Sequence, residues 1–231
     1  MEPLRQIRLA AVNIDGVLLN DTFSPVIHHF VTSRGGRYDA EVEREIFSQP
    51  QLTAAKALGA AAGLDASPEA VLAAYFEERA DHLAAHPLRL LDGAVGLLLR
   101  LRGAGLLTVC YGGLDKSHFD RHLGEWAHLF DGPGYVCTND FRPGLHEITT
   151  EVFGLRHDQA LFIDDVARVA ETARELGVPF IGHPSDFAHG FQGELMRAAG
   201  VRHLVRSLDE IDEPLLRTLD DEAAAGRLWN H

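Results

Sequence analysis

IRLAAVNIDGVL, residues 7–18, is the segment from which the architecture of this 231-residue chain can be worked out. Its apolar run, 7–14, is typical of a fully buried strand, and the Asp15-Gly16 pair is typical of a turn. Strands buried on both faces occur mainly in parallel sheets that are covered by helices. Because such sheets bind ligands at the carboxyl ends of their strands, Asn13 and Asp15 mark a candidate site.

The same pattern recurs along the chain, where short apolar runs alternate with segments of helical length. The runs predict strands at 106–111, 135–138, 160–163 and 178–181, and a sixth at 201–205. Segments 94–103 and 167–176 have the periodicity of helices. This alternation predicts an α/β fold, namely a doubly wound parallel sheet in a Rossmann-like core.

The segment between the first two strands has no strand pattern and is too long for a crossover connection. It predicts helices at 26–33, 40–48, 52–62 and 68–85. Ser67 and Pro68 form a favourable helix start, with a capping hydroxyl followed by proline in the first turn. We therefore predict a helical cap at 21–87, inserted into a core made of 1–20 and 88–231, with a last helix or frayed end at 220–231.

The composition argues against several classes of function. Hydrophobic residues make up 46% of the chain, enough for a full core, which excludes wholesale disorder. The formal charge of −13 disfavours nucleic acid and anionic membrane surfaces as partners. No apolar run reaches the length of a membrane span, and the N-terminal stretch lacks the pattern of a signal peptide. Cys110 and Cys137 alone make neither a disulfide framework nor a zinc site. We expect a cytoplasmic protein, whose oligomeric state the sequence does not indicate.

Four polar segments follow the predicted strands in order. They are Asn13 to Leu18, Cys110-Tyr111-Gly112-Gly113, Phe141-Arg142-Pro143-Gly144 and Asp164-Asp165. This order, with a helical insertion after the first segment, resembles the haloacid dehalogenase-like superfamily, whose members are mostly phosphatases and phosphomutases. The resemblance covers about residues 5–185 and depends on four motifs in the right order rather than on any single one.

The resemblance implies a chemistry for the first and fourth segments. In the family, an Asp-x-Asp motif supplies the nucleophile and then the general acid and base, here at Asn13 and Asp15. The carboxylates after the fourth strand, here Asp164 and Asp165, hold Mg²⁺ together with the first motif. Asn13 has no nucleophilic carboxylate oxygen and lacks one negative charge, so we expect a weakened Mg²⁺ site.

The second and third segments also depart from the family pattern. A serine or threonine hydroxyl and a lysine hold the phosphoryl oxygens in the family. Here Arg142 stands at the lysine position and has a planar fork in place of a compact ammonium. The phosphate-pocket positions are Cys110, Tyr111, Gly112 and Gly113, none of which is a serine or threonine.

These departures predict a degenerate site that binds a small anionic or phosphorylated ligand between cap and core and is not an ordinary phosphatase. Two alternatives stay open: an active Mg²⁺-dependent hydrolase of a small organic phosphate, and a divergent reaction built on Asp15. Each site residue also has a structural interpretation. Asn13 and Asp15 suit turns, Asp164 and Asp165 suit a solvated loop, and Arg142 suits a surface position at a helix start.

Three further residues are candidates by their place in the sequence. Lys116 lies just beyond the second strand and is a candidate cation for the phosphate pocket. His183 follows the fifth strand at the same edge of the sheet and is a candidate general base. His118 shares a helix face with His122, four residues on, as metal ligands do, but the spacing implies no third ligand.

Overall fold

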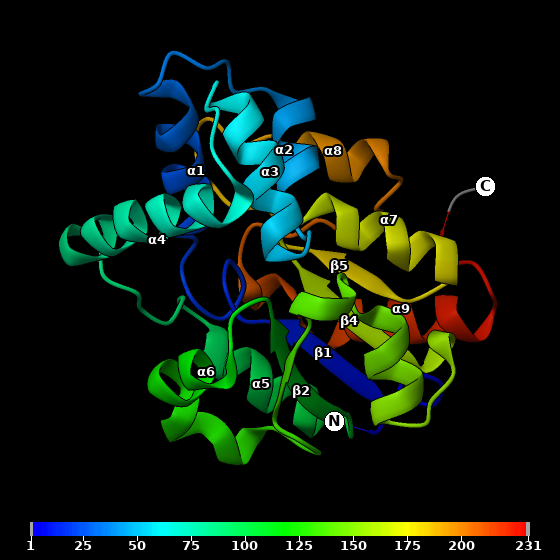
Figure 1. Cartoon of the computed structure of the whole chain (residues 1–231). Helices are drawn as coiled ribbons and strands as arrows, with labels where there is room; N and C mark the ends of the chain where they lie inside the picture. The colour runs from blue at the N-terminus through cyan, green and yellow to red at the C-terminus, as the bar shows by residue number, and fades with distance from the viewer. Residues whose placement is uncertain (1, 230–231) are drawn as a thin grey trace.

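The computed structural model describes residues 2–229, and one parallel sheet forms its centre (Figure 1). The spatial order of the strands is β3-β2-β1-β4-β5, so the chain winds outward from β1 in both directions. This confirms the predicted α/β class and doubly wound sheet. The strands are β1 (Leu9–Asn13), β2 (Leu107–Gly112), β3 (Tyr135–Cys137), β4 (Ala160–Asp164) and β5 (Phe180–Gly182).

Within residues 2–229 the chain forms nine α-helices, and none of them is long and apolar enough to cross a membrane. Four of these helices lie between β1 and α5 and form the cap over the sheet (Figure 1). The helices are α1 (Phe23–Thr32), α2 (Ala40–Ile46), α3 (Gln51–Ala61), α4 (Pro68–Ala85), α5 (Ala94–Gly103), α6 (Lys116–Leu123), α7 (Ala167–Leu176), α8 (Gln192–Ala198) and α9 (Glu213–Ala224).

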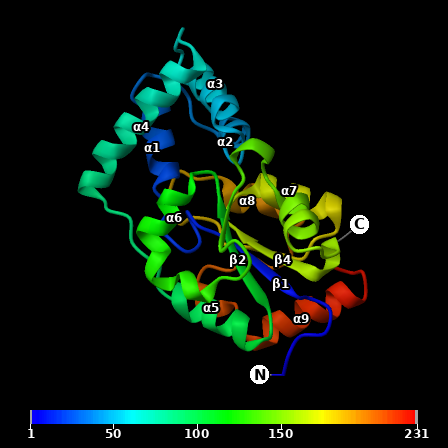
Figure 2. The ribbon, with the colours of Figure 1, turned by 60° about the horizontal axis from the view of Figure 1, so that its bottom comes forward.

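Alternate residues of each strand pack into two different apolar layers, as the period of a strand requires. In β1, Ala10 and Val12 pack with α5, α6 and α9, whereas Leu9 and Ala11 pack with α7, α8 and the cap. Figure 2 shows α5 and α9 on one side of the sheet and α7 and α8 on the other. All five residues of β1 are buried, which explains the continuous apolar run in the sequence.

Two short segments connect the cap to the core and run side by side. Asn20 accepts a hydrogen bond from the backbone of Arg89 at 2.8 Å, and its own N–H donates to the Arg89 carbonyl at 3.1 Å. Near the candidate site, Gln51 at the start of α3 donates its side-chain amide to the carbonyl of Gly113 at 3.0 Å. The Ser67 side chain accepts from the Ala70 N–H, as predicted for this helix start.

Three elements differ from the sequence-based predictions. The sixth strand, predicted at 201–205, does not form, because this segment joins the sheet only at an isolated bridge between Gly182 and Leu204. Helix α8 was not predicted, since only two of its seven residues, Gln192 and Met196, are buried. The predicted last helix begins earlier than 220, because α9 starts at Glu213 next to the capping Asp212.

Asp220 of α9 holds the segment that leads into β1. Its carboxylate accepts backbone hydrogen bonds from Arg5, Gln6 and Ile7 at 2.7–2.9 Å. Because Asp220→Ala leaves these donors without an acceptor, we expect it to lower the free energy of unfolding by about 2–4 kcal/mol. Urea denaturation checks this, with exposed Asp221→Ala as the matched control. An equal effect of the two substitutions would contradict the assignment.

Candidate functional site

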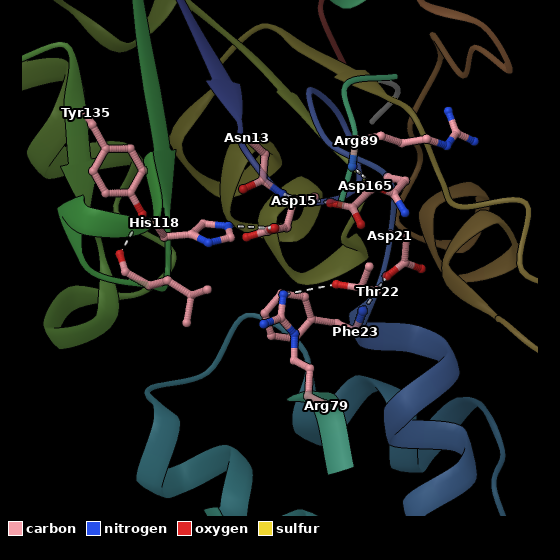
Figure 3. Close-up of polar contacts among 12 residues, drawn as sticks. Asn13, Asp15, Asp21, Thr22, Phe23, Arg79, Arg89, His118, Tyr135 and Asp165 are labelled. Atoms are coloured by element: carbon pink, nitrogen blue, oxygen red, sulfur yellow. Dashed lines mark hydrogen bonds and ion pairs between the residues drawn. The ribbon is translucent and has the colours of Figure 1, made fainter. Parts of the chain in front are cut away.

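The candidate site lies at the carboxyl edge of the sheet, where β1, β2 and β4 end, and Asn13 is at its centre (Figure 3). The buried side-chain amide of Asn13 donates to the backbone carbonyl of Asp15 and to Oδ1 of Asp165, both at 2.8 Å. The carbonyl of Asp15 can only accept, so the amide must present its nitrogen to this side. Asn13 therefore joins the turn after β1 to the carboxylate after β4.

The two adjacent carboxylates after β4 have different surroundings. Asp164 accepts from the hydroxyl of Tyr111 and, at 2.8 Å, from the N–H of Val166. Burial raises the pKa of Asp164 to about 6. Burial and the neighbouring charge of Asp164 raise the pKa of Asp165 well above its ordinary value. Both oxygens of Asp164 thus have protein partners, which gives this carboxylate a structural role.

Asp165 packs directly on the turn after β1. A Cβ atom at Gly16 would lie 2.1 Å from Oδ2 of Asp165, and the φ of Gly16 is +89°. Only glycine fits both the close approach and the left-handed backbone. The Asp15-Gly16 pair therefore makes the tight turn that brings Asp165 within reach of Asn13.

Asp15 faces a histidine of α6. Its Oδ1 lies 3.0 Å from Nε2 of His118, and both side chains are nearly buried (Figure 3). Asp115 starts α6 by accepting from the N–H of Ser117, and Phe119 and Leu123 bury the inner face of the helix. His118 reaches Asp15 from this helix, and the pair has the geometry of a carboxylate with an acid-base imidazole.

Gly112 and Gly113 at the end of β2 have no side chain at the positions where the resemblance led us to expect a hydroxyl. Cys110 is buried, and burial raises the pKa of its thiol. A Cβ atom at Gly112 would lie 2.5 Å from a methyl carbon of Ile14, and one at Gly113 would lie 2.1 Å from Nη2 of Arg142. Neither glycine position can take a serine side chain unless its neighbour moves.

Arg142 lies against Gly113, and its charge acts on the nearby carboxylate of Asp164, where it offsets part of the rise in pKa that burial causes. Within residues 2–229 it makes no hydrogen bond or ion pair, although its Nε is buried. An unpaired guanidinium at the carboxyl edge of a sheet is suited to an anion, which it can bind through two parallel N–H groups.

A cavity of about 130 Å³ lies between the cap and this edge of the sheet. Aromatic and aliphatic side chains of the cap form one end of it, and the polar residues of the sheet edge form the other. Of the predicted site residues, those that line it are Asn13, Asp15, Gly113, Arg142, Asp164 and Asp165. Those outside its lining are Cys110, Tyr111, Gly112, Lys116 and His183.

Lys116 and His183 have other partners. Lys116 forms an ion pair with Asp120 on the exposed side of α6. His183 is buried after β5 and donates from Nδ1 to the carbonyl of Gly16 at 3.1 Å. Neither contact brings the side chain to the cavity, and His183 instead supports the turn that carries Asp15.

No model of a protein family and no curated protein matches the sequence. Solved structures do match it. A family IA, variant 3 haloacid dehalogenase-like hydrolase from Entamoeba histolytica is 16% identical, with a TM-score of 0.66 over 93% of this chain and 100% of that one. A predicted phosphatase from Clostridium acetobutylicum is 18% identical, with a TM-score of 0.64 over 92% and 99%. A haloacid dehalogenase-like hydrolase from Deinococcus radiodurans, solved with phosphate and sodium, is 17% identical, with a TM-score of 0.60 over 93% and 97%.

The chain has the haloacid dehalogenase-like fold. This finding confirms the fold that the four motifs indicated. The identities are too low to transfer an activity, because one fold serves many chemistries.

Mg²⁺, which the haloacid dehalogenase-like fold implies, does not fit the donors at this edge. It prefers an octahedral shell of oxygens at short distance. Here N–H donors of Asn13 point at Asp165 and at the Asp15 carbonyl, and both oxygens of Asp164 already accept hydrogen bonds. In the described part of the chain, no three His, Cys, Asp or Glu side chains are grouped to hold a metal. We therefore derive no step through a metal ion.

The haloacid dehalogenase-like motifs located the sheet-edge end of the cavity, but not its cap end. His118 was considered only as a metal ligand beside His122, and its contact with Asp15 was not predicted. Ser48, Gln51 and Tyr75 of the cap were not predicted to contribute to the cavity. Helical spacing gives no signal for His118, because at 3.6 residues per turn it lies roughly 100° from Phe119 and roughly 140° from Leu123 around α6.

His183 should make stability depend on pH. Burial lowers its pKa below the ordinary 6.5, so the unfolded chain binds the proton more readily than the folded chain. The stability that the neutral ring contributes is present above pH 6.5 and is lost as pH falls toward the lowered pKa. For His183→Asn we expect a loss of about 1 kcal/mol at pH 8 that shrinks across this window.

Urea denaturation of both proteins between pH 8 and pH 5 measures this difference. The raised pKa values of Asp164 and Asp165 act in the same way in both proteins and cancel. A difference that does not change with pH would contradict the assignment.

Proposed function

We propose that the chain binds a small organic anion between cap and core and does not transfer phosphoryl groups through an aspartyl-phosphate. The amide of Asn13 is the observation that carries this proposal. It stands where an attacking carboxylate is required, has no nucleophilic oxygen, and uses its N–H groups to hold Asp15 and Asp165. The bare backbone at Gly112 and Gly113 supports the same conclusion, because phosphoryl oxygens lack a hydroxyl partner there.

Arg142 supports an anionic ligand, and the charges around it favour a carboxylate. A carboxylate has one negative charge, against up to about two for a phosphate monoester. The carboxylate of Asp15 lines the same cavity and would repel a doubly charged group more strongly. The formal charge of −13 disfavours nucleic acids and anionic membranes as partners, and we propose a small-molecule function in the cytoplasm.

The contact between Asp15 and His118 favours a second candidate function. Asp15 lines the cavity and could activate a water molecule there, with the His118 imidazole 3.0 Å behind it, to hydrolyse a bound ester without a covalent intermediate. Such a reaction would be divergent chemistry built on Asp15. It would require turnover that Asp15→Asn and His118→Asn both abolish.

The proposal predicts the effect of restoring the nucleophile. Asn13→Asp replaces two N–H donors by a carboxylate beside Asp165, so we expect its free energy of unfolding to fall by about 2–3 kcal/mol without Mg²⁺. We expect Mg²⁺ to recover part of this loss and to leave the native chain unchanged. Thermal unfolding with and without Mg²⁺ measures both effects, with Asn13→Asp/Asp165→Asn as the control that removes the response.

Hydrolysis of 4-nitrophenyl phosphate is measured on the same proteins. We expect no turnover by the native chain above that of Asp15→Asn, with or without Mg²⁺. Mg²⁺-dependent turnover by the native chain that Asp15→Asn abolishes would contradict the proposal and favour an active phosphatase.

Arg142 should bind the anion directly. We expect Arg142→Gln to weaken the binding of benzoate at least tenfold, because one charge-assisted hydrogen bond is worth about 1.5–3 kcal/mol. Isothermal titration with benzoate measures the change. Arg121→Gln on the exposed side of α6 is the matched control. If the native chain and Arg142→Gln bind benzoate with equal affinity, the proposal that Arg142 binds an anion is wrong.

A further inference from the structure

Buried polar atoms without partners gather around the cavity between cap and core. Among residues 2–229, eight buried side-chain nitrogen or oxygen atoms have no hydrogen-bond partner, and four of these belong to residues that line this cavity. The four are Asp21 Oδ2, Ser48 Oγ, Tyr75 Oη and Arg142 Nε. Buried polar groups are almost always paired, so this concentration points to a ligand that supplies the partners.

Tyr75 and Ser48 are the strongest of these observations, because both side chains are more than nine-tenths buried. Tyr75 is 5% exposed and Ser48 is 8% exposed. The ring of Tyr75 packs among aromatic rings, with centroids 6.3 Å from Phe30 and 5.4 Å from Phe76. Burial raises the pKa of Tyr75, so its hydroxyl stays protonated and can donate. The packing of the ring thus fixes the position of the Tyr75 hydroxyl without giving it a hydrogen-bond partner.

The backbone at Ser48 adds to this picture. Its φ is +54°, and it is the only residue other than glycine in 2–229 with a positive value. A serine in the left-handed region is uncommon and is retained where its side chain has a use. Ser48 lies in the connection between α2 and α3, directly beside the cavity.

The rest of the cap end is apolar and of limited size. Its lining includes Phe23, Ile27, Phe47, Leu58, Leu72 and Phe76. The volume of about 130 Å³ is close to the ~150 Å³ at which an apolar cavity in another protein binds benzene. The cavity as a whole, with the cap end and the sheet edge together, is therefore of a size that suits one ring.

We infer that the ligand is a hydroxylated aromatic carboxylate with a single ring. Its ring packs in the cap, its hydroxyl bonds with Tyr75 and Ser48, and its carboxylate pairs with Arg142. The carboxylate end rests on the proposed function, whereas the ring and the hydroxyl rest on the cap alone. Asp21 Oδ2 favours a neutral hydroxyl that can donate over a second anionic group at this end.

The experiment titrates the full chain with 3- and 4-hydroxybenzoate, benzoate, phenol and acetate. We expect at least one hydroxybenzoate to bind with a Kd below about 1 mM, more tightly than benzoate and far more tightly than acetate. Tyr75→Phe should weaken hydroxybenzoate about tenfold and leave benzoate unchanged, because it removes one hydrogen bond and no apolar surface.

Stability measurements on the same variant separate binding from folding. Tyr75→Phe removes a buried hydroxyl without a partner, so we expect its Tm to stay the same or rise. A merely structural hydroxyl would lower it. Ala55→Phe, which places a ring in the cavity, should block the aromatic probes, and Lys56→Ala on the exposed side of α3 should not.

Each failure points to a different part of the inference. The assignment of the ring and the hydroxyl to the cap is wrong if acetate binds as tightly as the hydroxybenzoates. It is also wrong if the hydroxybenzoates still bind more tightly than benzoate to Tyr75→Phe. In both cases the binding of an anion at Arg142 stands. If phenol binds through Tyr75 and no carboxylate binds, the proposed anion is wrong and the cap assignment stands. If no aromatic probe binds, the inference is overturned.

Discussion

The hydrogen-bonded amide of Asn13 connects the ends of two neighbouring strands, and the other contacts of the sheet edge are arranged around it. Asp165 reaches Asn13 only because Gly16 has no side chain in its way. The same Gly16 accepts a hydrogen bond from His183 after β5. One turn thus joins β1, β4 and β5 at the carboxyl edge. Asp15, carried by this turn, is held in position for its contact with His118.

The sheet and the cap could be predicted because their sequence signals are local. A parallel strand buried on both faces must be apolar throughout, and 7–14 satisfies this condition. The helix start predicted at Ser67 and Pro68 is the start of α4 in the structure, where the side chain of Ser67 caps the helix. The meeting of Asn13, Asp15 and Asp165 followed from topology, since parallel strands bring their carboxyl ends to one edge.

Other features depend on how elements rotate and pack, which the sequence does not state. Lys116 and His118 lie two residues apart on α6, so they point to different sides of the helix. His118 nevertheless reaches Asp15, whereas Lys116 at the start of α6 stays exposed and pairs with Asp120. At 3.6 residues per turn, Lys116 lies nearer than His118 to the face of Phe119 and Leu123, so helical spacing alone would have predicted the reverse. Segment 201–205 has the composition of a strand but pairs at a single bridge. The cavity combines residues from four cap helices with the sheet edge, and no local pattern predicts such a combination.

The changes at the three altered motifs are physically coupled, and this coupling argues against a site that a single substitution would restore. A hydroxyl placed at position 113 would collide with the guanidinium of Arg142, and one at position 112 would collide with Ile14. Arg142 can approach so closely only because Gly113 has no side chain. Likewise, a carboxylate at position 13 would meet Asp165 without the N–H groups that now hold it. Asn13 and Gly113 thus each fit the side chain beside them, Asp165 and Arg142, which supports the proposal of a ligand other than a phosphoryl group.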